Sequence, residues 1–382
     1  MQYVKPDYFD DFKCIADKCP DTCCAGWKIM IDENALQKYE RDRSVFGSRL
    51  ANGIDWQESS FSQNNGRCSM LNDNNLCDLI TFHGEDWLCE TCHRYPRHVE
   101  EFEGLREWSL SLSCPVAAEI MLNNQKPVRF LTEEDNEEDP LAEEFEDFDF
   151  LLFTQLAGAR EVLFSIVQNR VIPMEHRLSV IMDMAREMQV CLDEERLFDM
   201  DEIIDRYAEK ANARKQNALC ERMPEKKELQ KEERYEQLKQ GFIALTNLER
   251  LREDWTEVLV QAENTLYAHG YEEYRIIYDA FCREYIEAGE EQYWEIFQEQ
   301  ILMFFLYTYF CGAVYDDCIY SKVALAVFSV CFIQEFVMCS WYLADKYIDK
   351  QECIRLAYRY AREVEHSDEN LVCLEEWLLA NM

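Results

Sequence analysis

The stretch DFLLFTQLAGAREVLFSIVQNR, residues 149–170, decides the fold of this chain of 382 residues. Its apolar residues recur at steps of three and four, which is the period of an amphipathic α-helix. The same spacing recurs in HRLSVIMDMAREMQVCL, residues 176–192. Beyond residue 150, prolines are scarce and glycine pairs typical of turns are absent, which argues against a sheet-rich domain. We therefore expect a mainly α protein.

Two other apolar stretches raise the question of a membrane span. ILMFFLYTYFCGAVY, residues 301–315, is short, and VALAVFSVCFIQEFVMCSWYLA, residues 323–344, carries Gln334 and Glu335 at its centre. A spanning helix needs about 20 apolar residues and tolerates a central charge poorly. We interpret both stretches as buried core helices and expect no membrane span.

Nine of the eighteen cysteines lie in the first 114 residues and form spaced groups. They are Cys14, Cys19, Cys23, Cys24, Cys68, Cys77, Cys89, Cys92 and Cys114. Thiols gathered in this way either form disulfides or bind a soft metal centre. The first residues contain no apolar signal segment, so we expect a cytoplasmic protein, in which metal binding is favoured over disulfides. We predict that these nine form a metal module and that the nine later cysteines are core residues.

The spacing of the cysteines leaves the identity of the metal open. Zinc takes four ligands, often as two short pairs, and Cys19-x3-Cys23 with Cys89-x2-Cys92 supplies such pairs. Iron–sulfur clusters also use four thiolates. Nine cysteines exceed one site, so either there are two centres or several cysteines do not ligate. We expect Trp27 to shield the centre from water.

Three histidines flank the last cysteine groups. They are His83, His93 and His98. For each of them a surface or packing role is favoured over a role as a metal ligand or proton carrier.

Charge and composition set the domain organisation. The formal net charge is −37, so the chain repels phosphate backbones and we expect no nucleic acid partner. Eleven of the 17 residues 133–149 are acidic, which favours a solvated linker over a surface that steers a cationic substrate. We predict a small cysteine-rich metal-binding module at 1–125, an acidic linker at 126–150 and a larger all-helical domain at 151–382, with the module packed on that domain.

The cysteine phrases carry a resemblance to a known family. YVKPDYFDDFKCIADKCPDTCCAGWKIMID, residues 3–32, resembles the flagellin lysine-N-methylase family (FliB). CSMLNDNNLC, residues 68–77, and CETCHRYPR, residues 89–97, resemble the zinc- or iron-chelating module of that family. His93 stands where the family usually has an arginine, and Arg94 follows it. The resemblance covers about the first 115 residues.

The resemblance implies a protein-lysine N-methyltransferase. Such an enzyme transfers methyl from S-adenosylmethionine to lysine side chains of flagellin, which would be its partner, with a 4Fe–4S cluster or, as the alternative, zinc. A lysine with a pKa of about 10.4 is protonated at neutral pH, so the enzyme must remove a proton before the nitrogen attacks a methyl group. The chain has no Walker, G-x-S-x-G or G-x-G-x-x-G motif that would identify a catalytic residue or a donor pocket.

A function from another class competes with this one. A cysteine-rich metal-binding module on a helical protein-interaction domain, without catalysis, would keep every thiolate and need no methyl donor.

Overall fold

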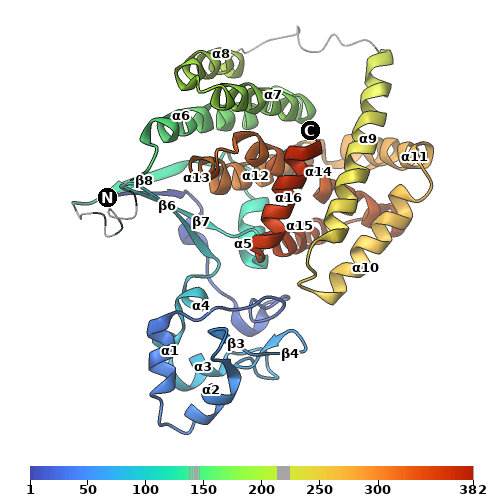
Figure 1. Cartoon of the computed structure of the whole chain (residues 1–382). Coiled ribbons are helices and arrows are strands. Elements are labelled where there is room, and N and C mark those ends of the chain that lie inside the picture. The colour runs from blue at the N-terminus through green and yellow to red at the C-terminus, as the bar shows by residue number, and fades with distance from the viewer. Residues whose placement is uncertain (137–138, 140, 142–144, 146, 213–223, 382) are drawn as a thin grey trace.

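The computed structural model describes residues 1–136, 139, 141, 145, 147–212 and 224–381. A large helical body, a sheet beside it and a small lobe below make up the molecule (Figure 1). We call residues 24–94 the cysteine lobe. The prediction of a mainly α protein is confirmed.

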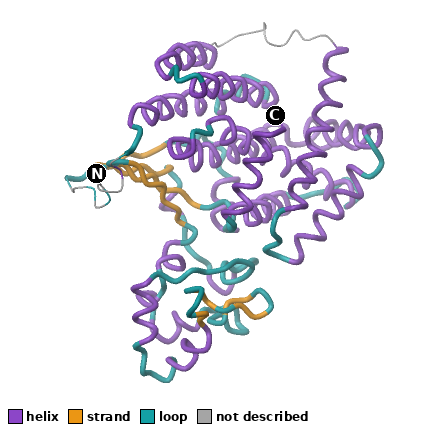
Figure 2. The backbone as a smooth tube through the Cα atoms, in the orientation of Figure 1, coloured by secondary structure: helices purple, strands orange, loops and turns teal. Residues whose placement is uncertain are grey.

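A four-stranded mixed sheet joins the chain's first residues to the helical body (Figure 2). Its strands, in the spatial order β6-β7-β1-β8, are Arg97–Phe102, Leu105–Leu110, Gln2–Pro6 and Phe130–Glu134. Strands β6 and β7 form a hairpin, and β1 runs parallel to β7 and antiparallel to β8. Gln2 lies opposite both Leu105 and Glu134, so three distant segments meet at β1.

The cysteine lobe has short elements and a core of its own. Its helices are α1 (Glu33–Glu40), α2 (Gly47–Gly53), α3 (Asp78–His83) and α4 (Glu90–Arg94), and its strand pairs are β2 (Ile54–Asp55) with β3 (Ser60–Phe61) and β4 (Gln63–Asn64) with β5 (Arg67–Cys68). Asp32 caps α1 by accepting a hydrogen bond from the Ala35 amide at 2.9 Å. Tyr39, Leu50 and Phe61 are buried in this core.

The helical body is built from α5 to α16 around one hydrophobic core. Its helices are α5 (Pro115–Leu122), α6 (Phe150–Val167), α7 (Met174–Asp193), α8 (Met200–Asn212), α9 (Pro224–Asn247), α10 (Glu253–Ala262), α11 (Tyr271–Phe281), α12 (Glu291–Tyr309), α13 (Ala313–Asp316), α14 (Ile319–Leu343), α15 (Lys350–Glu365) and α16 (Asp368–Asn381). The π-helical segments Glu263–Tyr267 and Cys282–Glu290 continue α10 and α11.

The apolar stretches that predicted helices lie in this body. Asp149 caps α6 through the Leu152 amide at 2.9 Å. Helices α6 and α14 are long and apolar enough to cross a membrane, but 61% and 89% of their most apolar windows are buried inside the protein. The carboxylate of Glu335, in the middle of α14, accepts hydrogen bonds from the hydroxyls of Tyr267 and Tyr274. The central charge of this helix is therefore satisfied within the core.

The two hydrophobic cores divide the chain at other positions than the predicted domain limits. Phe12, Leu112 and Ala117 belong to the core of the helical body, although they lie within the predicted module at 1–125. The limits at 125 and 150 remain predictions. Strand β8 occupies part of the predicted linker, and residues 137–138, 140, 142–144 and 146 of that linker lie outside the described residues.

The nine later cysteines differ in how deeply they are buried. Cys191, Cys311, Cys339 and Cys353 are buried as predicted, whereas Cys282, Cys318 and Cys331 are half-buried, Cys373 is exposed and Cys220 lies outside the described residues. The core interpretation is therefore wrong for Cys373.

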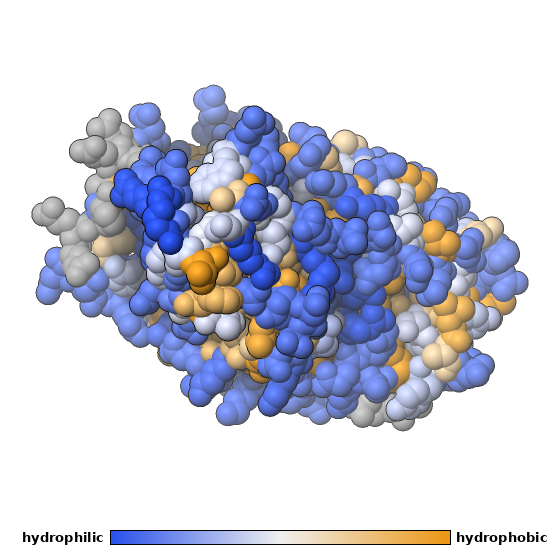
Figure 3. Space-filling model, turned by 90° about the horizontal axis from the view of Figure 1, so that it is seen from below, coloured by the Kyte–Doolittle hydropathy of each residue, from blue (hydrophilic) through white to orange (hydrophobic). Residues whose placement is uncertain are grey.

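Seen from below, the surface is mainly hydrophilic with small apolar patches (Figure 3).

We predict that Glu107→Ala destabilises the protein strongly. The Glu107 carboxylate on β7 binds the Arg160 guanidinium on α6, and both side chains are buried. Removing one partner leaves a buried charge unpaired, so the free energy of unfolding should fall by about 3–5 kcal/mol in urea unfolding. Glu194→Ala, which breaks an exposed pair with Arg196, should cost less than about 1 kcal/mol. Equal losses in the two variants would contradict this prediction.

Candidate functional site

The nine predicted metal cysteines lie in two neighbourhoods. Five of them pack in the core of the cysteine lobe, namely Cys24, Cys68, Cys77, Cys89 and Cys92. Cys114 belongs to the core of the helical body, and Cys14, Cys19 and Cys23 lie on the N-terminal loop that runs past it. Every cysteine in the described ranges is a free thiol.

Backbone contacts bring the lobe cysteines together. The Cys68 amide donates to the Cys24 carbonyl at 2.9 Å. A β-bridge between Leu71 and Cys77 folds the following turn back on this pair. Cys89 is the N-cap residue of α4, which carries Cys92.

Neighbouring thiols in this region shift each other's pKa. A hydrogen bond between the Cys23 and Cys24 thiols raises the pKa of Cys23 and lowers that of Cys24 to about 7. The Cys89–Cys92 pair behaves in the same way, because their hydrogen bond lowers the pKa of Cys89 and raises that of Cys92. One thiol of each pair is therefore more easily ionised, and the thiolate is the form that binds metals.

Arg362 of α15 holds the other thiol neighbourhood in place. Its Nε donates to the Ser113 carbonyl at 2.8 Å, and its Nη2 donates to the Asp21 carbonyl at 2.7 Å. Its Nη1 also lies 2.7 Å from the Asp21 carboxylate. The loop that carries Cys19 and the residue before Cys114 are thus bound by one guanidinium.

The described cysteines match a soft metal in chemistry but not around a single ion. Within residues 1–136, 147–212 and 224–381, no three His, Cys, Asp or Glu side chains converge closely enough to hold one metal ion. A 4Fe–4S cluster is less demanding in this respect, because each of its four thiolates binds a different iron. The lobe holds five free thiols in or against one core, which is one more than the four thiolates that such a cluster uses.

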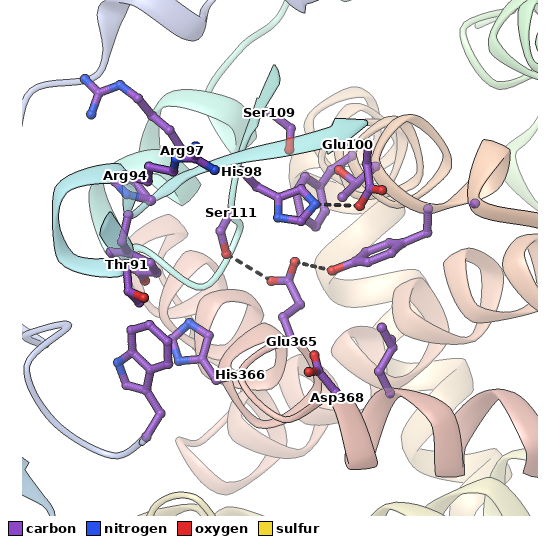
Figure 4. A pocket seen from close by; sticks show the side chains of 18 of the residues that line it. Thr91, Arg94, Arg97, His98, Glu100, Ser109, Ser111, Glu365, His366 and Asp368 are labelled. Atoms are coloured by element: carbon purple, nitrogen blue, oxygen red, sulfur yellow. Dashed lines mark hydrogen bonds and ion pairs between the residues drawn. The ribbon is translucent and has the colours of Figure 1, made fainter. Parts of the chain in front are cut away.

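A cavity of about 460 Å³ lies between the cysteine lobe, the β6–β7 hairpin and helices α12 and α15 (Figure 4). Trp27 and Tyr95 line it from the N-terminal part of the chain, and Tyr309, Glu365 and His366 line it from the helical body. This cavity has the size of a small-molecule site, for which about 300–1,000 Å³ is typical.

Aromatic rings form the side of the cavity that faces the thiols. The rings of Trp27 and His366 lie 4.6 Å apart, and those of Trp27 and Tyr95 lie 5.7 Å apart. Trp27 also donates from its indole nitrogen to the Cys23 carbonyl at 2.7 Å. Burial lowers the pKa of His366 to about 3, so this ring is neutral at physiological pH.

Polar groups form the opposite side. The Glu365 carboxylate accepts hydrogen bonds from the Tyr309 hydroxyl at 2.8 Å and from the Ser111 hydroxyl at 3.4 Å. Burial raises the pKa of Glu365 to about 7, against the opposing effect of the Tyr309 hydrogen bond. The buried hydroxyls of Ser109 and Thr308 line the same cavity, and neither has a hydrogen-bond partner in the part of the chain that the structure describes.

The structure assigns different roles to the residues considered from sequence. His83 bonds to Asp42 and stacks on Trp87, and His93 is exposed, whereas His98 bonds to Glu100 beside the cavity. Trp27 lies against the loop of Cys23, and its role in shielding a metal centre stays a prediction.

Sequence reasoning missed several polar residues of the cavity, among them Ser109, Thr308, Tyr309 and Glu365. No motif contains them, since they lie on the three separate elements β7, α12 and α15 and meet only in the folded chain.

Comparisons with known proteins match this chain to the FliB lysine N-methylase family and to proteins with related names. A family model described as the FliB lysine N-methylase C-terminal domain matches residues 160–382. Similar curated proteins include the flagellar biosynthetic protein FliU of Salmonella muenchen and the lysine-N-methylases of Salmonella choleraesuis (strain SC-B67) and Salmonella typhimurium (strain LT2), each 29% identical over 130 residues. The match spans 32% of this chain, 77% of FliU and 32% of each lysine-N-methylase. No solved structure matches the chain.

We predict that Arg362→Ala exposes the thiols of the N-terminal loop. The substitution removes charge-assisted hydrogen bonds to the loop, each worth about 1.5–3 kcal/mol. In reduced, metal-free protein, the rate at which a thiol reagent labels Cys19 and Cys23 should rise at least roughly tenfold, because each 1.4 kcal/mol is a factor of about ten. Arg355→Ala, on the same helix but with its guanidinium paired to Glu352 rather than to the loop, is the control. Unchanged labelling by Arg362→Ala would refute this role.

Proposed function

This chain belongs to the FliB lysine N-methylase family, and we propose that it transfers methyl groups to lysine side chains of flagellin. The family match over residues 160–382 supports the assignment, as do relatives named lysine-N-methylase and a relative named for flagellar biosynthesis. We place the reaction in the cytoplasm.

One observation carries the location of the reaction. Tyr309 and Glu365, from the family-matched part of the chain, line the same cavity as Trp27 and Tyr95, from the cysteine-bearing part. Methyl transfer needs a site that excludes water and holds the attacking nitrogen in line with the methyl group. The cavity between the two parts offers aromatic rings on one side and polar groups on the other, which supports it as the place of the reaction.

We propose S-adenosylmethionine as the methyl donor. The lysine nitrogen must first lose a proton, because an ammonium has no lone pair. The nitrogen lone pair then forms the new bond to the methyl carbon as the carbon–sulfur bond breaks. The electron pair of that bond stays on sulfur, which leaves as a neutral thioether.

We also propose a 4Fe–4S cluster, with zinc as the alternative, as the resident metal centre. The candidate ligands are the nine N-terminal cysteines, of which the five lobe thiols exceed the four that one cluster needs. When bound, a cluster would supply redox-active iron that its thiolate ligands make anionic overall, and zinc would supply a closed structural site. Trp27 donates to the Cys23 carbonyl and also lines the cavity, so we propose that it limits the access of water to the centre.

The function predicts methylation of flagellin by the intact protein. Anaerobically purified protein with its metal centre, incubated with lysine-bearing flagellin and S-adenosylmethionine, should add about 14 Da per methyl group to lysines, read by peptide mass spectrometry. Reactions without the methyl donor are the control. No methylation by metal-loaded protein would reject the enzyme and favour a non-catalytic metal-binding interaction module.

The metal proposal predicts that cysteine variants lose the centre. Cys92→Ala should lose most of its bound iron and visible absorption in anaerobic preparations, because the lobe thiols act as one donor set. Cys19→Ala tests whether the N-terminal loop contributes to the same centre. Cys373→Ala, at an exposed cysteine of α16, should keep its iron. A colourless wild-type protein that contains only zinc would exclude the cluster.

A further inference from the structure

The cavity holds the Glu365 carboxylate, which no Lys or Arg of the described chain pairs with. The Glu365 carboxylate accepts hydrogen bonds from the hydroxyls of Tyr309 and Ser111, and it forms no ion pair with a Lys or Arg among the described residues. Burial is the main influence on its pKa, and the charge of His98, which is itself hydrogen bonded to Glu100, opposes that influence. The basic residues that line the cavity are already engaged. Lys322 binds Asp316 at 2.6 Å, Arg94 binds Glu90 at 2.5 Å, and the Arg97 guanidinium lies over the Phe12 ring. Figure 4 shows Glu365 between the His98–Glu100 pair and His366.

Two hydroxyls beside this carboxylate also lack partners. The side chain of Ser109 belongs to a residue only 3% exposed, and that of Thr308 to one only 4% exposed. Neither hydroxyl is hydrogen bonded within the described ranges. Burying a hydroxyl without a partner is unfavourable, so each such group in a native structure calls for an explanation. A polar ligand in the cavity is the direct explanation for both hydroxyls, because both residues line the cavity.

The set of acceptors defines the chemistry of that ligand. An alkylammonium has three N–H donors and no acceptor, and carboxylate and hydroxyl oxygens accept hydrogen bonds. The aromatic faces of Trp27 and Tyr95 attract cations. His366 adds no positive charge to this wall, because its ring is neutral at physiological pH. An anionic ligand, by contrast, would meet the Glu365 carboxylate directly.

We propose that this cavity binds the ammonium group of the substrate lysine and that Glu365 is the catalytic residue that takes its proton. This inference rests on the proposed function and deepens it by naming the substrate subsite. In the step, one N–H bond of the ammonium breaks and an O–H bond forms on Glu365. The nitrogen keeps the electron pair and becomes the nucleophile for the sulfonium methyl group. Glu365 returns the proton to solvent after the product leaves.

The protonation equilibrium of Glu365 suits this task. Burial raises its pKa to about 7, so the carboxyl is partly ionised at neutral pH and accepts a proton readily. The other titratable or charged groups that line the cavity are Arg94, Tyr95, Arg97, His98, Glu100, Tyr309, Lys322, His366 and Asp368. Arg362, one turn before Glu365 on α15, is bound to Asp21.

Ligand binding provides the first test. A short peptide with one lysine and the same peptide with norleucine, which keeps the alkyl chain but lacks the ammonium, are titrated calorimetrically into the holoprotein. Wild type should bind the lysine peptide at least roughly tenfold more tightly, and Glu365→Gln should lose this preference. Equal affinities of wild type for the two peptides, or an unchanged preference in Glu365→Gln, would overturn the proposal.

Glu363→Gln is the matched control. Glu363 is also buried on α15 with a pKa raised to about 7, but it accepts a hydrogen bond from the Leu251 amide and does not line the cavity. This variant should keep the lysine preference. Glu365→Asp, which retains a carboxylate, should keep part of it, and thermal unfolding of each variant identifies any that fails to fold.

The pH profile of methylation provides the second test. In wild type, kcat/KM should rise with pH through about 7 as Glu365 ionises. Glu365→Gln should lower kcat/KM by roughly 100-fold or more and lose this limb. A Glu365→Gln enzyme with wild-type kcat/KM and pH profile sinks the inference but leaves the methyltransferase function standing. Glu365-dependent lysine binding without any methylation by loaded wild type rejects the function and keeps the binding site.

Discussion

The arrangement of the site depends on the guanidinium of Arg362. It is buried, with 2% of the residue exposed, and it binds the Asp21 carboxylate and the carbonyls of Asp21 and Ser113. A buried charge of this kind is tolerated only when it is paired and hydrogen bonded, so the N-terminal loop must remain in place. Because Glu365 follows Arg362 by three residues on α15, both lie on neighbouring positions of one helix face. Helix α15 therefore fixes the position of the thiol loop relative to the cavity.

Strand β7 supplies the second constraint. Alternate residues of a strand point to the same face, so Glu107, Ser109 and Ser111 share one side of the hairpin and its continuation. Glu107 binds Arg160 of α6, which fixes the sheet against the helical body. The next two residues on that side then reach the cavity, where Ser111 donates to Glu365 and Ser109 lies unpartnered. The buried Glu107–Arg160 pair thus stabilises the fold and also positions Ser109 and Ser111 in the cavity.

The parts of the fold that follow from local spacing were predictable, and the parts that depend on distant pairing were not. Helices α6 and α7 lie where a period of three to four apolar residues places them. The sheet depends on pairing Gln2 with Glu134, and nothing local in either segment indicates the other. Glu365 gave no signal because α15 buries charged residues such as Arg362 and Glu363 among its apolar ones. Their role appears only when the loop at Asp21 and the hairpin are placed beside the helix.

The energetics of Glu365 indicate why such a site persists. Its folded pKa of about 7 lies above its ordinary value of 4.5, so between these pH values the folded state binds the proton more tightly than the unfolded chain. The contribution of this group to stability is therefore complete below pH 4.5 and is lost as the pH rises to about 7. At neutral pH the free protein holds a partly ionised carboxylate that burial disfavours and that no Lys or Arg of the described residues pairs with. Binding of an ammonium stabilises the ionised Glu365 carboxylate, whereas an uncharged analogue does not. The site therefore selects a cationic substrate over its uncharged analogue.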